Sequence, residues 1–199
     1  MSKFIVALLL TVAAHTSVFA KETIQIDLSV LQKISWTEQE QKNAEIITDF
    51  VQNVMNNHNF DYVLERYNDS AYTQHNRNLP DKMTGLVGFL EEFVEDYPDY
   101  SYDVKHIYVD GDYVIFHSHA TLNKDDRGND QKGMNIIDTW RLENGRIVEH
   151  WDSIQALDGF MRFYSLISGG NIRSVSWGEP QVQRQRRPHA KNRVTVLII

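Results

Sequence analysis

The sequence predicts an α+β fold, in which three N-terminal helices pack on a curved four-stranded antiparallel sheet. Between residues 37 and 97, apolar residues recur every three or four positions, as in helices with one buried face. From residue 100 onward, apolar and polar residues alternate, as in strands. Because the helices precede the strands, we expect them to cover one face of a sheet that closes over them as a cone with a pocket inside.

The predicted helices have recognisable starts and stops. Thr37 and Glu40 have the spacing of a capping box at the start of the first helix. A short second helix covers about 62–67, and a third covers about 84–97 and ends before a proline, which cannot continue a helix. Residues 71–76 show no helical periodicity. The stripe of the first helix consists of Ala44, Ile47, Phe50, Val51, Val54 and Met55.

The four strands are predicted at 102–108, at 113–122, and in a hairpin at 134–155. Asp110-Gly111 forms the first turn, and a polar loop precedes the hairpin. The hairpin combines apolar residues with three ionisable side chains, and it is therefore the first candidate for a functional site.

The turn of this hairpin decides which side chains share a face, because a one-residue change of register moves a whole strand to the other side. A two-residue loop at 144–145 would put Asp138 on the opposite face from Asp152. A three-residue loop at 143–145, with the glycine left-handed in a bulge, would pair Asp138 with His150 and gather all three side chains.

We predict the bulged register, because it separates an apolar face from an amphipathic one. The inner face would carry Met134, Ile136, Asp138, Trp140, Val148, His150, Asp152 and Ile154. The outer face would carry Asn135, Ile137, Thr139, Arg141, Ile147, Glu149, Trp151 and Ser153.

Two aspartates and an imidazole on one apolar face fit acid/base chemistry. Removing a proton next to a carbonyl needs a carboxylate base, and the enolate that forms needs a hydrogen-bond donor. Burial and like charge would raise the pKa of either Asp138 or Asp152 and leave the other ionised. His150 could tune either acid, and His75 could reach the site from the helical side. The alternative is a satisfied buried polar network without catalysis.

Several motifs resemble the SnoaL-like polyketide cyclase family over about residues 37–156. They are Tyr72-Thr73-Gln74-His75-Asn76, Leu79-Pro80, Gly85, Asp138-Thr139-Trp140-Arg141, and Gly145-Arg146-Ile147-Val148-Glu149-His150-Trp151-Asp152. The resemblance implies the cone-shaped fold shared with nuclear transport factor 2 and ketosteroid isomerase, usually dimeric, with a pocket that needs no cofactor. It also implies that Asp152 acts as the general acid/base of an intramolecular aldol closure.

We therefore predict an exported, cofactor-free lyase or isomerase that acts on a small carbonyl compound in an apolar pocket. The alternative is a non-enzymatic domain that binds a small apolar ligand. The candidate catalytic residues are Asp152, Asp138, His150 and His75. The candidate substrate-binding residues are Tyr72, Gln74, Asn76, Trp140 and Phe116, although Trp140 and Phe116 could instead be core residues.

Other partners are predicted from charge and composition. The formal net charge of −7 argues against nucleic acid as a partner. His117 and His119 form a His-Ser-His motif, but no third ligand has matching spacing, so no metal site is predicted. The apolar outer-face residues Ile137, Ile147 and Trp151 predict a homodimer, unless the C-terminal tail covers them.

The two ends of the chain are predicted to lie outside the domain. Residues 1–20 resemble a secretory signal peptide cleaved after Ala20, which predicts a periplasmic or secreted protein; the alternative is a buried N-terminal helix. The chain has no cysteine, so no lipid anchor on cysteine is expected. Residues 21–36 would be a lead-in. Residues 157–199 would be a poorly ordered tail, or a basic arm that binds an anionic surface.

Overall fold

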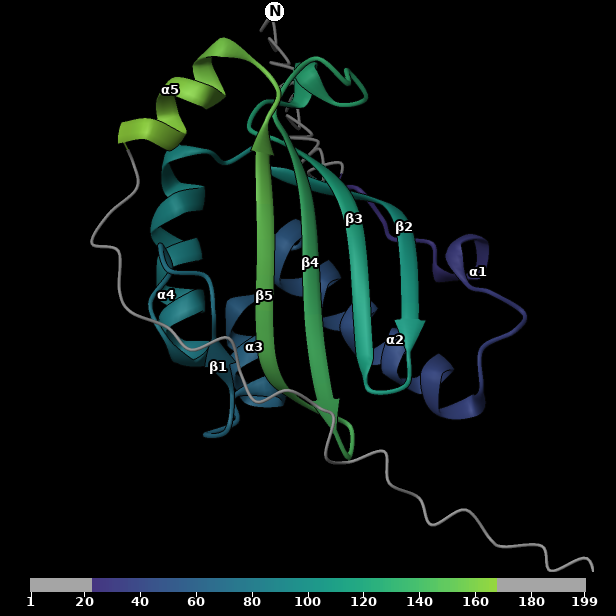
Figure 1. Cartoon of the computed structure of the whole chain (residues 1–199). Helices are drawn as coiled ribbons and strands as arrows, with labels where there is room; N and C mark the ends of the chain where they lie inside the picture. The colour runs from purple at the N-terminus through teal and green to yellow at the C-terminus, as the bar shows by residue number, and fades with distance from the viewer. Residues whose placement is uncertain (1–22, 168–199) are drawn as a thin grey trace, which may run out of the picture.

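The computed structural model describes residues 23–167, so the predictions for residues 1–20 and 168–199 lie outside the described part (Figure 1). The helices are α1 (Leu28–Leu31), α2 (Glu38–Val51), which continues as a π-helical turn η1 (Gln52–Asn56), α3 (Phe60–Tyr67), α4 (Lys82–Asp96) and α5 (Gly159–Ile167). A short 3₁₀ turn covers Lys124–Asp126. The strands are β1 (Thr73–Gln74), β2 (Ser101–Asp110), β3 (Tyr113–Thr121), β4 (Met134–Glu143) and β5 (Arg146–Ala156).

The α+β class is confirmed, and its details differ from the prediction. The sheet is five-stranded and mixed, in the order β1-β5-β4-β3-β2, with β1 parallel to β5 and the other neighbours antiparallel. Helices α2, α3 and α4 lie on one side of the sheet, and α5 lies across the end of β5 (Figure 1). Helix α5 forms in a segment that was predicted to be poorly ordered. No helix among residues 23–167 is long and apolar enough to cross a bilayer.

Helix α2 begins at the predicted capping box. The Thr37 hydroxyl accepts the backbone N–H of Glu40 at 3.2 Å, and the Glu40 carboxylate accepts that of Thr37 at 2.8 Å. At the other end, the π turn directs Asn56 to β2, where its side-chain amide exchanges two hydrogen bonds with the Tyr102 backbone. These bonds of 2.9 and 2.8 Å fix the position of Tyr102, whose side chain contributes to the site described below.

The β4–β5 turn differs from the predicted one. Asn144 and Gly145 have φ values of 53° and 76°, as expected for a two-residue turn with both residues left-handed, and Glu143 pairs with Arg146. The predicted three-residue loop is therefore wrong. An extra residue instead sits at Val148, because Leu142 pairs with Ile147 and Arg141 with Glu149.

Because of this bulge, the side chains beyond it lie on the face that was predicted from the three-residue loop. Beyond it Asp138 pairs with Asp152, so Asp138, His150 and Asp152 do share one face of the sheet. The bulge also buries two consecutive side chains, Ile147 at 2 % and Val148 at 3 % exposure. Placing Ile147 on the outer face was therefore wrong; its side chain belongs to the core.

Candidate functional site

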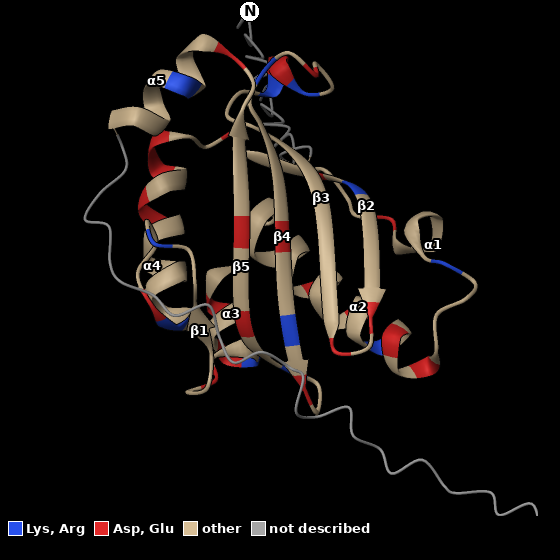
Figure 2. Cartoon of the chain, in the orientation of Figure 1, with Lys and Arg blue, Asp and Glu red and all other residues tan. Residues whose placement is uncertain are grey.

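The site is built on the concave face at the middle of β4 and β5, where Figure 2 shows an acidic position on each strand. Asp138 and His150 are buried, and Asp152 is only partly buried. The side chains arrive from neighbouring strands because Asp138 is the cross-strand partner of Asp152, and Trp140 that of His150.

Both ring nitrogens of His150 are engaged. Nδ1 lies 3.0 Å from Oε1 of Gln74, and Nε2 lies 2.9 Å from Oδ1 of Asp138. The Trp140 ring stacks on the imidazole with 5.2 Å between centroids. Because each nitrogen already faces a protein partner, His150 acts on the pocket through Asp138.

Asp138 has a second donor in Tyr102, whose hydroxyl hydrogen-bonds to Oδ2. Burial raises the pKa of the Tyr102 hydroxyl well above its usual range, and the Asp138 charge raises it further. Tyr102 therefore stays protonated and remains a donor. The carboxylate of Asp138 is thus held at both oxygens by β2 and β5.

Asp152 is the carboxyl group that faces the open space. The side-chain amide of Asn76 lies 2.7 and 2.6 Å from its two oxygens. Burial raises the pKa of Asp152 above its ordinary value; the Asp138 charge adds to the rise, while His150 and the Asn76 hydrogen bond oppose it. A carboxyl group with a raised pKa holds its proton to a higher pH than an ordinary aspartate does, which suits it to acid/base exchange.

A cavity of about 300 Å³ opens over these side chains. Its polar part is formed by Asn76, Asn78, Asp138, His150, Asp152 and Ser165. Among the described lining residues there is no lysine or arginine. The walls and rim are largely apolar or aromatic: Phe50, Met55, Leu79, Leu86, Phe89, Leu90, Phe93, Tyr100, Tyr102, Met134, Ile136, Trp140, Ile154 and Tyr164.

The structure brings together some of the predicted site residues and separates others. Asn76 and Trp140 line the cavity, as predicted for substrate-binding residues. Gln74 lies behind His150, and its amide nitrogen donates to the Tyr72 hydroxyl at 3.2 Å. The fully buried Phe116 packs edge-on against Trp140, which matches its alternative reading as a core residue.

His75 lies on the other face of the sheet. Its ring stacks on Trp151 at 4.5 Å between centroids, and its Nε2 lies 3.6 Å from Glu149. His75 does not line the cavity. The reason is the short parallel pairing of β1 with β5: Gln74, opposite His150, points inward, so the next residue points outward.

Sequence reasoning missed Tyr100, Tyr102 and the α5 residue Tyr164. Tyr100 lies directly before β2 and Tyr102 is its second residue, and the face of this strand could not be assigned because the turn at 110–111 left its register open. Tyr100 is buried, and burial together with the charges of Asp138 and Asp152 raises the pKa of its hydroxyl. Its hydroxyl lies 4.0 Å from the Met55 sulfur, which is a weak acceptor.

Two groups of side chains contain residue types that can bind a metal ion. His117 and His119 bind Asn135 at 2.6 Å and the Lys132 carbonyl at 2.7 Å, respectively, and no cluster of possible ligands among residues 23–167 includes them. Ligand atoms of Asp138, His150 and Asp152 lie within 4.8 Å of one another. A cation there would have to break the hydrogen bond between His150 and Asp138, so the arrangement fits a shared proton better than a metal.

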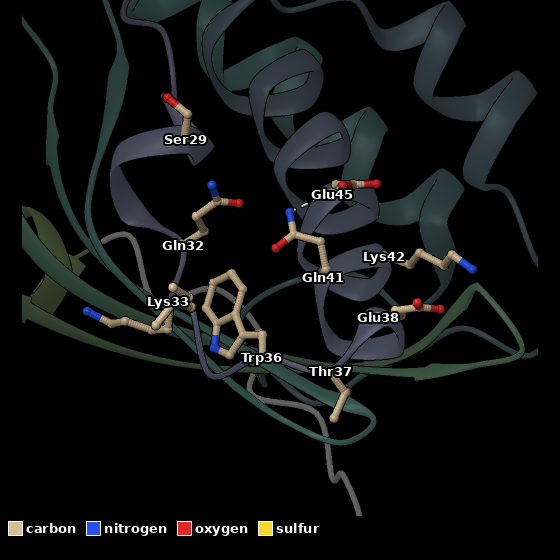
Figure 3. Close-up of a pocket in the computed structure, with 10 residues that line it drawn as sticks. Ser29, Gln32, Lys33, Trp36, Thr37, Glu38, Gln41, Lys42 and Glu45 are labelled. Atoms are coloured by element: carbon tan, nitrogen blue, oxygen red, sulfur yellow. Dashed lines mark hydrogen bonds between the residues drawn. The ribbon is translucent and has the colours of Figure 1, made fainter.

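A second hollow lies between α1 and the start of α2 (Figure 3). It measures about 680 Å³ and is bordered by polar and charged side chains such as Lys33, Glu38 and Lys42 around Trp36. The hydrogen bond drawn there joins Gln41 to Glu45 along the helix at 3.2 Å. These are solvated surface groups without a converging set of donors and acceptors, and they do not suggest a reaction.

Comparison with known proteins identifies the family. The model of the SnoaL-like domain matches residues 47–150, which is more than half of the chain. The chain belongs to the SnoaL-like family. The match ends at His150, two residues before Asp152. Among curated proteins, no sequence matches the chain significantly.

Other proteins of known structure share the fold of this SnoaL-like protein. A proposed polyketide cyclase from Bacillus cereus superposes with a TM-score of 0.52 at 16% identity, covering 69% of this chain and 87% of the other. Bal32a, from a soil-derived mobile gene cassette, gives 0.51 at 14% identity, covering 64% and 99%. At these identities, the comparison shows that these proteins share the α+β fold.

Proposed function

We propose that this SnoaL-like protein is a lyase or isomerase that performs acid/base chemistry, of the aldol or enolisation type, on a small carbonyl compound. The observation that carries the proposal is Asp152, a carboxyl group with a raised pKa that faces an apolar cavity. Family membership supports a cyclase or isomerase, and one relative of the same fold is named as a proposed polyketide cyclase.

The proposed first step is proton abstraction. The Asp152 carboxylate takes a proton from the carbon next to the substrate carbonyl, and the C–H electrons form an enolate. The Tyr100 hydroxyl is the candidate donor to the enolate oxygen, because it lines the cavity and its hydroxyl contact is a thioether sulfur. It remains protonated because its pKa is raised.

The second step depends on the substrate. In an isomerisation, the Asp152 carboxylic acid returns the proton to a different carbon. In an aldol closure, the enolate carbon attacks a second carbonyl, and the acid protonates the new alkoxide. Either path regenerates the carboxylate, so no oxidant, reductant or external base is consumed.

The cavity walls favour an uncharged ligand. No described lining residue is a lysine or arginine, whereas Asp152 can be negative, so an anionic substrate would meet repulsion without a fixed counter-charge. The cavity volume of about 300 Å³ is that of roughly ten water molecules. A cavity of this size suits a compact ring compound.

Proton exchange tests this function without the natural substrate. We would measure loss of the α-proton signals of 1-tetralone and 2-tetralone in D₂O by NMR, with the wild-type protein and with Asp152→Asn. The wild type should accelerate exchange, and the variant should lose about 10²–10⁴-fold of that rate. His75→Asn is the matched control on the opposite face and should exchange at the wild-type rate.

The same experiment addresses the alternative, a binding domain without catalysis. If both tetralones raise the melting temperature of the wild type and of Asp152→Asn alike, but exchange is no faster than in buffer, the acid/base proposal is rejected. The apolar walls of the cavity favour this second reading.

We also propose that the outer face of the sheet mediates a homodimer. Ile137 on that face is 43 % exposed, and Trp151 is partly exposed next to it. The Arg141–Glu149 ion pair would form part of the polar rim. Sedimentation should show a wild-type dimer and an Ile137→Glu monomer; a wild-type monomer at micromolar concentration rejects the interface.

A further inference from the structure

We propose that Gln74 is a positioning residue that sets the protonation of His150, so that the Asp138–His150 pair holds one shared proton and acts as a neutral unit behind Asp152. The protonation state follows from hydrogen-bond geometry alone. Only its catalytic consequence rests on the proposed function.

The argument begins with the side-chain oxygen of Gln74. The backbone N–H of Asn76 lies 2.9 Å from the Oε1 atom of Gln74. A backbone N–H can only donate, so the atom that it contacts must be the amide oxygen and not the nitrogen. The nitrogen end is accounted for separately, since it donates to the Tyr72 hydroxyl at 3.2 Å. The orientation of the Gln74 amide is therefore fixed at both ends.

The same oxygen lies 3.0 Å from Nδ1 of His150. An amide oxygen cannot donate, so Nδ1 must carry the hydrogen of this bond. The opposite neutral tautomer, with hydrogen only on Nε2, would place the lone pair of Nδ1 against the lone pairs of Gln74. That arrangement would lose a hydrogen bond in a place where Gln74 is fully buried and His150 is 3 % exposed.

The proton between His150 and Asp138 follows from this tautomer. With Nδ1 protonated, the 2.9 Å contact from Nε2 to Asp138 needs one further hydrogen. It resides on Nε2, giving an imidazolium and a carboxylate, or on Oδ1, giving two neutral groups. Both forms have the same total number of protons and a net charge of zero, which is one proton more than a neutral imidazole beside a carboxylate.

The surroundings support a neutral pair. Asp138 is 2 % exposed, and leaving a single charge at such depth is costly. The groups that face the pair are the Tyr102 hydroxyl from β2, which binds Asp138, the Trp140 ring from β4, and Asp152 from β5. Tyr100 also lies close enough for the Asp138 charge to affect it. None of these groups supplies a cation, so the balancing proton has to lie within the pair.

The consequence for Asp152 is a simpler titration. Asp152 faces a neutral pair in place of a second negative charge, so the ionisation of Asp152 is not coupled to a net charge on the pair. The rate of proton exchange with substrate would then depend on one ionisation, that of Asp152, on the acidic side of the pH profile. Removing the acceptor at residue 74 should release the shared proton and expose Asp152 to the charge of Asp138.

Nitrogen NMR of the full chain labelled with ¹⁵N-histidine tests the protonation state directly, with His150→Gln used to assign the signals. In the wild type at neutral pH, Nδ1 of His150 should carry a hydrogen, as its contact with the Gln74 oxygen requires. A His150 that carries hydrogen only on Nε2 would overturn the proposal.

Variants at residue 74 test the role of the acceptor. Gln74→Leu should shift His150 to the Nε2–H tautomer, whereas Gln74→Glu keeps an acceptor oxygen and should retain the wild-type pattern. Tyr72→Phe is the matched control, because Asn76 still orients Gln74. An unchanged His150 spectrum in Gln74→Leu would contradict the positioning role. If that variant does not fold, the wild-type and Gln74→Glu spectra still decide the question.

This readout is independent of the proposed function. Protonated Nδ1 without any α-proton exchange would reject the acid/base function and leave the positioning role intact. Where exchange is measurable, the rate for Gln74→Leu should depend on pH through two ionisations in place of one, while Tyr72→Phe keeps one.

Discussion

Two histidines, His150 on β5 and His75 directly after β1, show how the two faces of this sheet differ. His150 on the concave face has both ring nitrogens hydrogen-bonded, to Gln74 and Asp138. His75 follows Gln74 directly in the sequence but lies on the convex face, stacked on Trp151 and 3.6 Å from Glu149. Both rings are buried to a similar degree, at 3 % and 7 % exposure. Burial alone therefore does not distinguish a candidate functional histidine from a packing one, whereas the set of partners does.

The contrast arises from the two-residue repeat of strand β1. Alternation sends Gln74 inward and His75 outward, so a sequence motif that reads as one unit is divided between the two faces. The inward residue contacts a network that holds protons, while the outward residue contributes an aromatic contact. Three substitutions would sharpen or break this comparison.

The largest effect is expected from His150→Leu. Without His150, Asp138 would be a buried carboxyl group whose charge has lost its counterpart, and the free energy of unfolding should fall by about 3–5 kcal/mol. Urea-induced unfolding at neutral pH measures the change. Adding Asp138→Asn in the same chain should recover part of the loss, because it removes the stranded charge. A loss below about 1 kcal/mol would show that the pair is not coupled as described.

A smaller effect of opposite sign is expected from Asp152→Asn. The pKa of Asp152 is raised above its ordinary value of 3.8 in the folded state, so folding favours the protonated form. Its contribution to stability is full below the ordinary pKa and is lost as pH rises through the raised one. The variant should therefore be more stable than the wild type at neutral pH, by about 0.5–2 kcal/mol, even though exchange is lost.

Thermal unfolding as a function of pH checks this prediction. The difference between Asp152→Asn and the wild type should shrink as the pH falls toward the ordinary aspartate range. A difference that stays constant with pH would mean that the stabilisation has another origin, and a variant less stable at neutral pH would contradict the raised pKa.

The smallest effect is expected from His75→Leu. The substitution removes the stacked contact with Trp151 but keeps an apolar side chain, so the free energy of unfolding should fall by about 0.5–1.5 kcal/mol. The rate of α-proton exchange should be unchanged. A loss of exchange comparable to that of Asp152→Asn would place His75 in the reaction after all and would remove the distinction between the two faces.

The sequence determined the features that depend on local pattern. Helical periodicity and the Thr37–Glu40 capping box located α2, and alternation located the four long strands. The grouping of Asp138, His150 and Asp152 on one face was also correct, because the apolar residues around them set the face regardless of where the extra residue lies. Family resemblance pointed to the same residues and is confirmed by the family match.

Only the tertiary structure decided the rest, because it depends on contacts between residues far apart in the chain. The bulge at Val148 replaces the one expected at the turn, since it lets both Ile147 and Val148 enter the core. The parallel pairing of β1 with β5 brings Gln74 to His150 and Asn76 to Asp152 across 76 residues, and the π turn after α2 fixes Tyr102. No local periodicity encodes such pairings, because their free energy comes from packing that exists only when the sheet and helices are assembled.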